Sequence, residues 1–166
     1  MTVDTRVSKI MRRDVITCSA EADVGEIAKL IWENDVSSIP VVEQGKVIGM
    51  VTDYDLISRE SEYDGPIYLP FIDVYFRVPG TGDPEQLRRI LATTARELMS
   101  YPVQTISQDD TVQDAATIMY ENRINALPVV DDNELLVGII ARADIVQMIA
   151  IEEARYLAES AASQES

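Results

Sequence analysis

Apolar and polar positions follow one another along this chain in an order that occurs twice. Residues 7–57 contain a short extended stretch, apolar residues at helical spacing, a β-type run, a turn and a second apolar run, and residues 95–146 repeat this order. A half-sized unit that occurs twice indicates that neither copy buries its apolar face alone. We therefore expect one globule with pseudo-twofold symmetry, whose matched clefts between the halves are natural ligand sites. At an offset of 88 the copies are identical at positions that include Met11, Val15, Thr17, Ser19, Val24, Ala28, Glu33, Asn34, Pro40, Val41 and Val42.

Each copy is predicted to contain a strand, a helix, a β-hairpin and a final helix, an α+β (α/β) unit of the order β-α-β-β-α. The first helix begins at a capping-box pattern, Asp23–Glu26 in one copy and Thr111–Asp114 in the other. It should end near Asn34 or Asn122, and the final helices follow Thr52 and Ala141. The predicted strands are residues 15–18, 39–42 and 47–51, and residues 103–106, 127–130 and 136–140.

Two segments lie outside the repeats. Residues 58–94 contain an apolar, aromatic stretch, 66–79, and a helical pattern from Pro84 to Thr94. This insert could be a hairpin or arm, a partner-docking or dimer-contact surface, or a pocket lid. The C-terminal helix should run from about Arg142 to Ala162 with more apolar residues than one short repeat needs, which favours a dimer contact. The predicted divisions are 1–57 for repeat 1, 58–94 for the insert, 95–146 for repeat 2 and 147–166 for the C-terminal helix and tail.

The charge of the chain argues against two kinds of binding partner. The formal net charge of −15 disfavours nucleic acid and anionic membranes, because both are bound mainly through clustered Lys and Arg. No apolar run reaches the length of a membrane span, and the first residues do not resemble a signal peptide. We therefore expect a cytoplasmic protein without nucleic-acid or membrane partners.

The chain also lacks the residues of several kinds of active site. It has no histidine and a single cysteine, Cys18, so neither a Ser-His-Asp triad nor an ordinary zinc site can be built. Carboxylates are plentiful, but nothing in their spacing suggests catalysis. We expect no enzyme activity, no metal and no required cofactor, and keep a small carboxylate-dependent enzyme as the third of three hypotheses.

The repeated motifs resemble those of the CBS domain, named for cystathionine β-synthase. Each copy has Met-x-x-x-Val-x-Thr; Ser-Ile-Pro-Val-Val and Gly-x-Val-Thr-x-x-Asp occur in the first copy, and related runs in the second. Two such domains in tandem resemble a Bateman module, and the likeness covers residues 7–57 and 95–146. It implies a regulatory, non-enzymatic module that binds an adenosine-type ligand (AMP, ADP, ATP or S-adenosylmethionine) in clefts between the repeats. It also implies a homodimer.

The resemblance further implies which residues form the first site. Asp55 would hold the ribose hydroxyls and Thr52 would meet a phosphate, which suits a carboxylate that accepts two charge-assisted hydrogen bonds. The base would lie against the other repeat. The remaining residues of this site are Met50 and Tyr54 nearby, and Met99, Gln104, Ile124, Asn125 and Ala126 from the other repeat.

The second site is expected to be weaker. Its acidic residue is Asp144, but Ala141 stands where the first site has a threonine, and Arg142 could substitute as the phosphate contact. The residues that the resemblance assigns to this site are Asp144, Ala141, Arg142, Ile139, Met11, Ile16, Val36, Ser37 and Ser38.

Simpler roles exist for several of these residues. Thr52 and Asp55 have the spacing of a capping box and could only begin a helix. Met11 and Met99 could be core residues. Arg12, Arg13, Arg123 and Arg142 are candidate phosphate partners that could equally be surface charges.

Two main functions follow. The leading hypothesis is a sensor of an adenine nucleotide that signals to an unidentified effector protein in trans. The alternative is a structural or protein-interaction module with vestigial clefts that docks a partner through the apolar insert.

Overall fold

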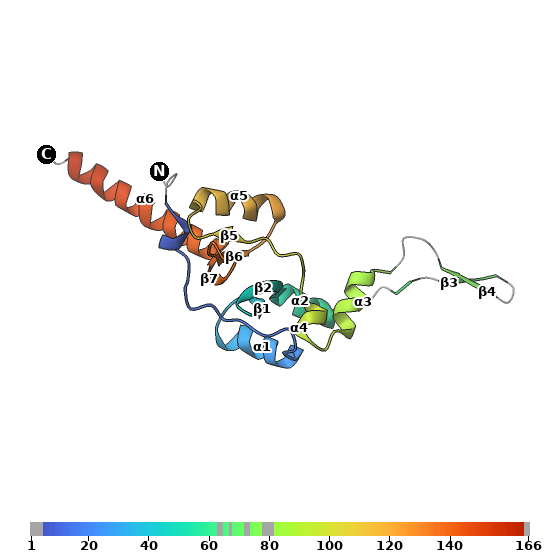
Figure 1. Ribbon diagram of the computed structural model, residues 1–166. Coiled ribbons are helices and arrows are strands. Elements are labelled where there is room, and N and C mark those ends of the chain that lie inside the picture. Colours follow the sequence, from blue (N-terminus) through green and yellow to red (C-terminus); the bar gives the residue numbers. More distant parts are fainter. Residues whose placement is uncertain (1–4, 63–64, 67, 72–73, 78–81, 165–166) are drawn as a thin grey trace. The chain divides into compact units, whose positions relative to one another are not determined.

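The computed structural model describes residues 5–62, 65–66, 68–71, 74–77 and 82–164 and divides the chain into two compact units (Figure 1). The first unit consists of residues 1–15, 44–47 and 103–166. The second consists of residues 16–43 and 48–102. Because the sequence repeats are 7–57 and 95–146, each unit combines most of one repeat with the leading segment of the other. The predicted division at 57, 94 and 146 therefore describes the sequence repeats and is not the division into compact units.

The second unit contains the body of the first repeat and the insert. Its elements are α1 (Val24–Glu33), β1 (Ser38–Glu43), most of β2 (Lys46–Thr52), α2 (Asp53–Glu60), β3 (Tyr68–Phe71), β4 (Val74–Arg77), α3 (Pro84–Leu91) and α4 (Ala95–Leu98). β1 pairs with β2, and β3 pairs with β4 in antiparallel register from Tyr68 opposite Arg77 to Phe71 opposite Val74. The insert therefore contains an antiparallel strand pair, as its hairpin alternative expected, while its role as an arm, docking surface or lid stays a prediction. Most side chains of the predicted apolar stretch 66–79 lie outside the described residues.

The first unit contains the body of the second repeat and begins with a short 3-10 helix, η1 (Val7–Lys9). Its other elements are β5 (Ile106–Ser107), α5 (Val112–Asn122), β6 (Ala126–Val130), β7 (Leu136–Ala141) and α6 (Arg142–Gln164). β5 is parallel to β6, and β6 is antiparallel to β7. In Figure 1, α5 and the start of α6 flank this three-stranded sheet.

The core of each unit contains residues from the leading segment of the other repeat. Val7 and Met11 are buried with Ile106, Leu127 and Ile140 of the second repeat. The backbone also joins these parts, because the Val7 N–H donates to the Asp110 carbonyl at 2.9 Å. The buried residues that the second copy's leading segment contributes to the core of the first repeat are Ala95, Leu98 and Met99. Each repeat thus needs a segment from the other copy to complete its apolar core.

The local signals for helix ends are confirmed. Thr111 and Asp114 form a complete capping box, whereas Asp23 caps α1 only by accepting from the Glu26 N–H. α1 ends at Glu33 with Asn34 as its cap, and α5 ends at Asn122 with Arg123 in the left-handed region at a φ of 56°.

The predicted first strands are too long. The run 15–18 is reduced to one parallel bridge between Cys18 and Val41, and the run 103–106 to the two-residue strand β5. The chain passes from one compact unit to the other at Val15–Ile16 and again at Pro102–Val103. Of the predicted strand residues, Val15 alone precedes a crossing, so the crossings do not account for the rest of the shortening. The insert helix is likewise shorter than predicted, because α3 ends at Leu91 rather than Thr94.

A methionine from each leading segment passes over a glycine of the body strand. A Cβ on Gly49 would lie 2.0 Å from the Met99 sulfur and 2.6 Å from its Cγ. A Cβ on Gly138 would lie 2.6 Å from the Met11 sulfur. The two glycines are equivalent in the repeat, so the same close approach occurs in both units.

We predict that Gly49→Ala lowers the free energy of unfolding by about 1–3 kcal/mol, the usual range for overpacking a core. The added methyl group must displace Met99, which is 6% exposed. Denaturant unfolding measures the change, and Gly49→Ala combined with Met99→Ala should recover part of it. Gly25→Ala, in the exposed first turn of α1, is the control: its added Cβ would lie 3.1 Å from Asp23 Oδ1, an exposed side-chain atom that can shift, so its loss should be clearly smaller. Additive effects of the Gly49 and Met99 changes would show that the two side chains do not compete for space.

Candidate functional site

Asp55 and Thr52 begin helix α2 as a complete capping box. The Asp55 N–H donates to Thr52 Oγ1 at 3.2 Å, while Asp55 Oδ2 accepts from the Thr52 N–H at 2.9 Å and from its hydroxyl at 2.8 Å. The helix-start role considered for these residues is therefore confirmed. It occupies only one oxygen of the carboxylate, so it does not exclude a second role for Asp55.

The other oxygen of Asp55 is paired with an arginine from the insert. Arg89, in α3, lies with its Nε 3.1 Å from Asp55 Oδ1. Asp55 is 3% exposed and the Arg89 side chain 21%, so this ion pair is largely shielded from water. A buried carboxylate without such a partner would carry a large desolvation penalty.

Asp144 is held in the same way in the other compact unit. Its Oδ2 accepts from the Ala141 N–H at 2.8 Å, and its Oδ1 lies 2.9 Å from Nη2 of Arg12. Asp144 is 8% exposed. The alanine in place of threonine leaves one hydrogen bond fewer at this carboxylate, as the sequence indicated.

The residues predicted for each site are distributed over both compact units. The described second unit contains Thr52, Asp55, Met50, Tyr54, Met99, Ile16, Val36, Ser37 and Ser38. The first unit contains Asp144, Ala141, Arg142, Ile139, Met11, Gln104, Ile124, Asn125 and Ala126. Both complete sites, each predicted to combine residues of the two units, stay predictions.

The residue directly before β1 or β6 lies beside the start of α2 or α6. The Asp53 N–H donates to the Ser37 carbonyl at 2.9 Å, and the Arg142 N–H donates to the Asn125 carbonyl at 2.9 Å. Ser37 therefore lies next to the helix that Asp55 begins, although the resemblance assigned it to the other site. Asn125 has the equivalent position beside the helix of Asp144.

The predicted methionine contacts are core residues of the units that hold the nearby carboxylates. Met99 is 6% exposed and belongs to the same core as the helix of Asp55, and Met11 is 8% exposed in the unit of Asp144. The residue after each methionine pairs by its backbone with the strand that contains the glycine: Ser100 with Met50, and Arg12 with Ile139. The interpretation of both methionines as core residues is therefore confirmed.

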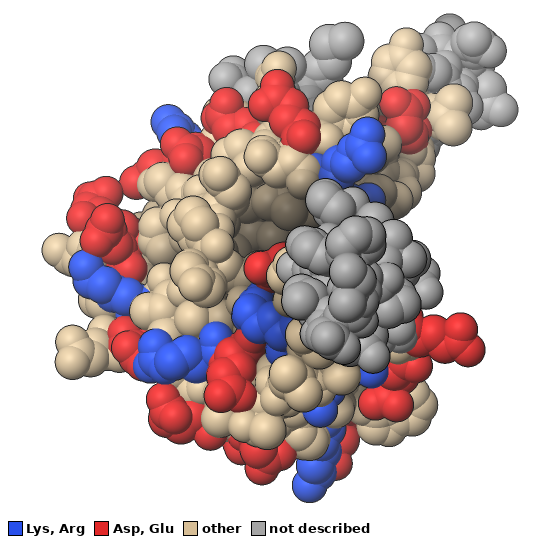
Figure 2. All heavy atoms as spheres, turned by 90° about the vertical axis from the view of Figure 1, so that its right-hand side faces the viewer, with Lys and Arg blue, Asp and Glu red and all other residues tan. Residues whose placement is uncertain are grey.

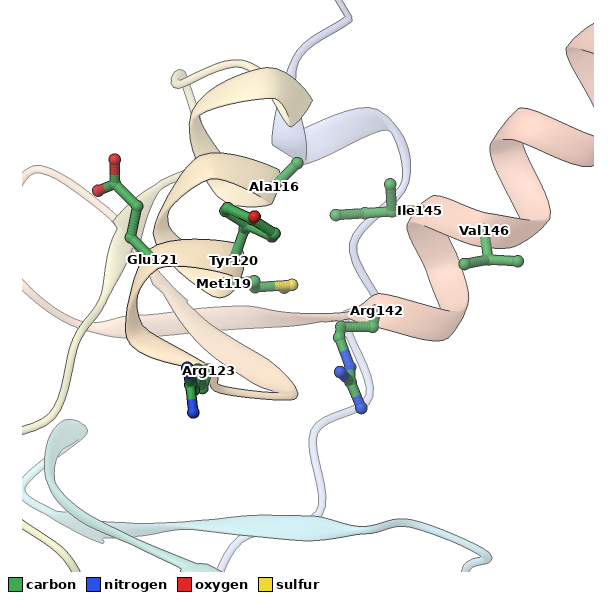
Figure 3. A pocket seen from close by; sticks show the side chains of 8 residues that line it. All are labelled: Ala116, Met119, Tyr120, Glu121, Arg123, Arg142, Ile145 and Val146. Atoms are coloured by element: carbon green, nitrogen blue, oxygen red, sulfur yellow. The ribbon is translucent and has the colours of Figure 1, made fainter.

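A groove of about 720 Å³ lies between α5 and α6 (Figure 3). Its floor is apolar, since Met119 and Ile145 are buried, and Tyr120 and Val146 stand at its exposed side. Arg142, predicted to contact a phosphate near Asp144, lines this groove instead of the smaller pocket that Asp144 lines. The residues around the groove are Ala116, Met119, Tyr120, Glu121, Arg123, Arg142, Ile145 and Val146.

The charged surface is mainly acidic, as the net charge of −15 requires. Acidic side chains are scattered over the face shown in Figure 2, among fewer basic ones. In the described part of the chain no cluster of three or more metal-ligating acidic or cysteine residues occurs. A helix long and apolar enough to cross a membrane is also absent from the described residues.

Sequence reasoning missed Arg89 altogether and treated Arg12 only as a candidate phosphate partner. Arg89 lies in the insert, 34 positions from Asp55, and nothing in the repeat pattern links them. Arg12 directly follows the repeated Met11, and the equivalent residue of the second copy is Ser100. This difference between two otherwise matching segments was a signal that Arg12 has a role of its own.

A family model described as the CBS domain matches residues 7–62 and 95–151. These two matches cover more than half of the chain. The chain therefore belongs to the CBS domain family and carries the domain as a tandem pair.

Relatives and solved structures agree with this assignment. The Methanocaldococcus jannaschii protein MJ1404 is 31% identical over 157 residues, which is 89% of this chain but only 32% of MJ1404. The CBS domain pair of protein MJ0100, solved in complex with 5′-methylthioadenosine and S-adenosyl-L-methionine, has a TM-score of 0.69 at 23% identity, covering 89% of this chain and 98% of that one. The structure of CBSX2 in complex with AMP has a TM-score of 0.68 at 21% identity, covering 90% and 98%. At these identities the structural likeness establishes the fold.

Cys18 is buried in the core of the second unit, where its thiol is held in the neutral form. Burial, and secondarily the charge of Glu26, raises the pKa of Cys18 from 9.0 to about 11. Because the thiolate is the reactive form of cysteine, this environment does not favour a nucleophilic role.

We predict that Cys18 reacts very slowly with a thiol reagent at pH 8 in the folded protein and rapidly after unfolding. The unfolded chain releases this proton near pH 9 and the folded chain near 11, so the contribution of the thiol to stability is constant below pH 9 and declines towards pH 11. Denaturant unfolding of wild type and Cys18→Ala across this range measures the difference, since other groups titrate in both proteins. Parallel stability curves with fast labelling would mean that the thiol is accessible.

Proposed function

We propose that this CBS pair is a regulatory module that binds an adenosine-type ligand, of the AMP, ADP or ATP class or S-adenosylmethionine. It would act in the cytoplasm and transmit the binding event to an effector protein in trans. The observation that carries the proposal is the buried aspartate in the first turn of each repeat's last helix, Asp55 and Asp144, in a fold whose solved relatives hold AMP or sulfur-containing adenosines. Each carboxylate is preorganised by its capping interaction and could accept ribose hydroxyls on its second oxygen.

The proposal favours the Asp55 site over the Asp144 site. Thr52 supplies a hydroxyl and α2 an N-terminal turn whose backbone N–H groups favour an anion. Ala141 cannot supply the hydroxyl. For such a module to act as a switch, the ligand must bind one state better, and a 10- to 100-fold preference provides about 1.4–2.8 kcal/mol.

The alternative, a protein-interaction module that docks through the insert, depends on side chains of the stretch 66–79. Most of these lie outside the described residues. Failure to bind any of the probes at millimolar concentration, together with a stable complex formed with an identified partner, would favour it over the sensor.

We predict that AMP, ADP, ATP or S-adenosylmethionine binds the wild-type chain and that Asp55→Asn weakens this binding at least tenfold. An amide accepts less strongly than a carboxylate, and charge-assisted hydrogen bonds contribute about 1.5–3 kcal/mol each. Isothermal titration calorimetry measures the affinity. At 100 times its dissociation constant the ligand should also stabilise the wild-type fold by about 2.7 kcal/mol.

Asp53→Asn is the matched control. It removes the same charge two residues away, where Asp53 only accepts from the Tyr54 N–H at 2.7 Å. It should leave ligand affinity within about twofold of wild type. Equal affinities for wild type and Asp55→Asn would remove Asp55 from the binding site and overturn the proposal for this cleft.

We further propose that the chain forms a homodimer through helix faces that the repeat leaves uncovered. Trp32 in α1 is 85% exposed and its repeat equivalent, Tyr120 in α5, is 86% exposed. Ile57 in α2 and its equivalent, Val146 in α6, are 66% and 64% exposed. Large apolar residues exposed at equivalent positions of both copies are typical of a surface that is covered in an assembly.

Sedimentation velocity should therefore give twice the mass of one chain at micromolar concentration. Trp32→Asp combined with Tyr120→Asp should shift the protein to the monomer without changing its circular dichroism, because both side chains are exposed in the single chain. Tyr101→Asp, an exposed tyrosine in a loop outside these helices, should remain dimeric. A wild-type monomer, or a dimer that persists in the double variant, would contradict this interface.

A further inference from the structure

The insert supplies the counter-ion of the carboxylate that the proposed ligand must use. Asp55 Oδ2 is occupied by the backbone and hydroxyl of Thr52, and Arg89 Nε takes Oδ1 at 3.1 Å. A ribose diol that binds a carboxylate needs the second oxygen as well. Arg89 and the sugar therefore compete for the same atom, on a residue that is 3% exposed while the arginine is in place.

The helix that carries Arg89 packs against α2 and α4 and adds several polar contacts, but it places no side chain in the core. None of its residues is buried, and Leu91 is 67% exposed. Gln86 Nε2 donates to Ser61 Oγ at 2.9 Å and to the Glu62 carbonyl at 3.1 Å, and Arg59 of α2 donates to the Ala92 carbonyl. A helix with few buried apolar contacts lies at the low end of local stability. A shift of α3 would take none of its own side chains out of the core, although Ala92, directly after the helix, is buried.

The equivalent pair in the other unit is built differently. Arg12 stands at the repeat position of Ser100, and both residues pair by their backbones with the strand that precedes the last helix. Serine is too short to reach the carboxylate, so the Asp55 site receives its arginine from the insert instead. Arg12 is fixed beside the buried Val7 and Met11, whereas Arg89 is on a helix without buried residues. Of these two arginines, Arg89 is the one whose supporting element can move.

We infer that Arg89 is a displaceable counter-ion, so that an adenosine-type ligand at the Asp55 site releases α3 and with it changes the position of the insert. This inference rests on the proposed function, because it takes the ribose as the competitor for Asp55. It assigns the insert the role of reporting occupancy of the site. It also makes Arg89 a determinant of affinity, since the site is available only while the arginine is away.

Hydrogen exchange of the α3 amides, residues 84–91, tests the displacement directly. AMP should speed exchange there in the wild-type protein. Arg89→Gln should show fast exchange without AMP and little further change with it. Arg88→Gln is the control, because Arg88 is the neighbouring residue on the same helix and contacts Glu85 and the carbonyls of Glu97 and Met99 rather than Asp55. Its exchange without AMP is measured as its own baseline, because these contacts also hold α3. It should keep the response to AMP.

Calorimetry with adenosine provides the second measurement, since this probe has the ribose diol but no phosphate whose binding could need a positive charge. If Arg89 covers Asp55 about 90% of the time, its removal tightens adenosine binding about tenfold. 2′-Deoxyadenosine should gain much less, because it has lost one of the two competing hydroxyls.

The outcomes separate this inference from the proposed function. AMP binding that depends on Asp55, with unchanged or slower exchange of α3, overturns the displacement and leaves the proposed function intact. Weaker adenosine binding by Arg89→Gln also overturns it, because the arginine would then be a ligand contact. Absence of AMP binding in both wild type and Arg89→Gln overturns both proposals, whereas binding by Arg89→Gln alone supports the competition.

Discussion

A buried carboxylate at the start of each repeat's last helix is the constraint on which the candidate site depends. Asp55 and Asp144 are each less than a tenth exposed, and a charge in that position must be compensated. One oxygen is satisfied locally, by the backbone N–H of residue 52 or 141. The other must be satisfied by something outside the helix. That second partner is an arginine in both units; in the proposed function, the two hydroxyls of a ribose would take its place at Asp55.

Exchange of the leading segments makes each repeat depend on the other copy for a complete apolar core. The core of the second unit includes Ala95, Leu98 and Met99, and that of the first includes Val7 and Met11. Removing a leading segment would therefore expose the apolar face of the copy that it does not belong to in sequence. Gly49 and Gly138 are required at the crossings because a methionine sulfur occupies the space that a side chain would fill. The repeat is thus preserved in three dimensions by contacts that a single copy cannot make.

Much of the fold could be predicted because its signals are local. The capping-box spacing located the starts of α1, α2 and α5, and the apolar runs located both hairpins, since these depend on neighbouring residues. The length of the first strands could not be predicted from the apolar pattern, because it depends on which residues pair with the neighbouring strand, and these are Cys18 in one copy and Ile106 and Ser107 in the other. The family resemblance did group Met99 with Asp55, but it was not predicted that the segment around Met99 completes the core of the first repeat. The repeat pattern shows which residues are equivalent but not which segment completes which core. The pairing of Arg89 with Asp55 comes from the insert, which has no counterpart in the repeat from which its contacts could be predicted.

The two copies show how a repeated site becomes asymmetric without loss of its basic chemistry. Both keep the aspartate, the backbone N–H donor and an arginine partner. They differ in the hydroxyl that donates to the aspartate and in how firmly the arginine is held. The first has the threonine hydroxyl and an arginine on a helix with no buried residue, and the second has an alanine and an arginine anchored beside core residues. A hydroxyl adds a contact for a ligand, and a loosely held counter-ion lowers the free energy needed to open the site. Both differences act in the same direction, so the acidic residue of the first repeat is the better placed to exchange its intramolecular partner for an external one.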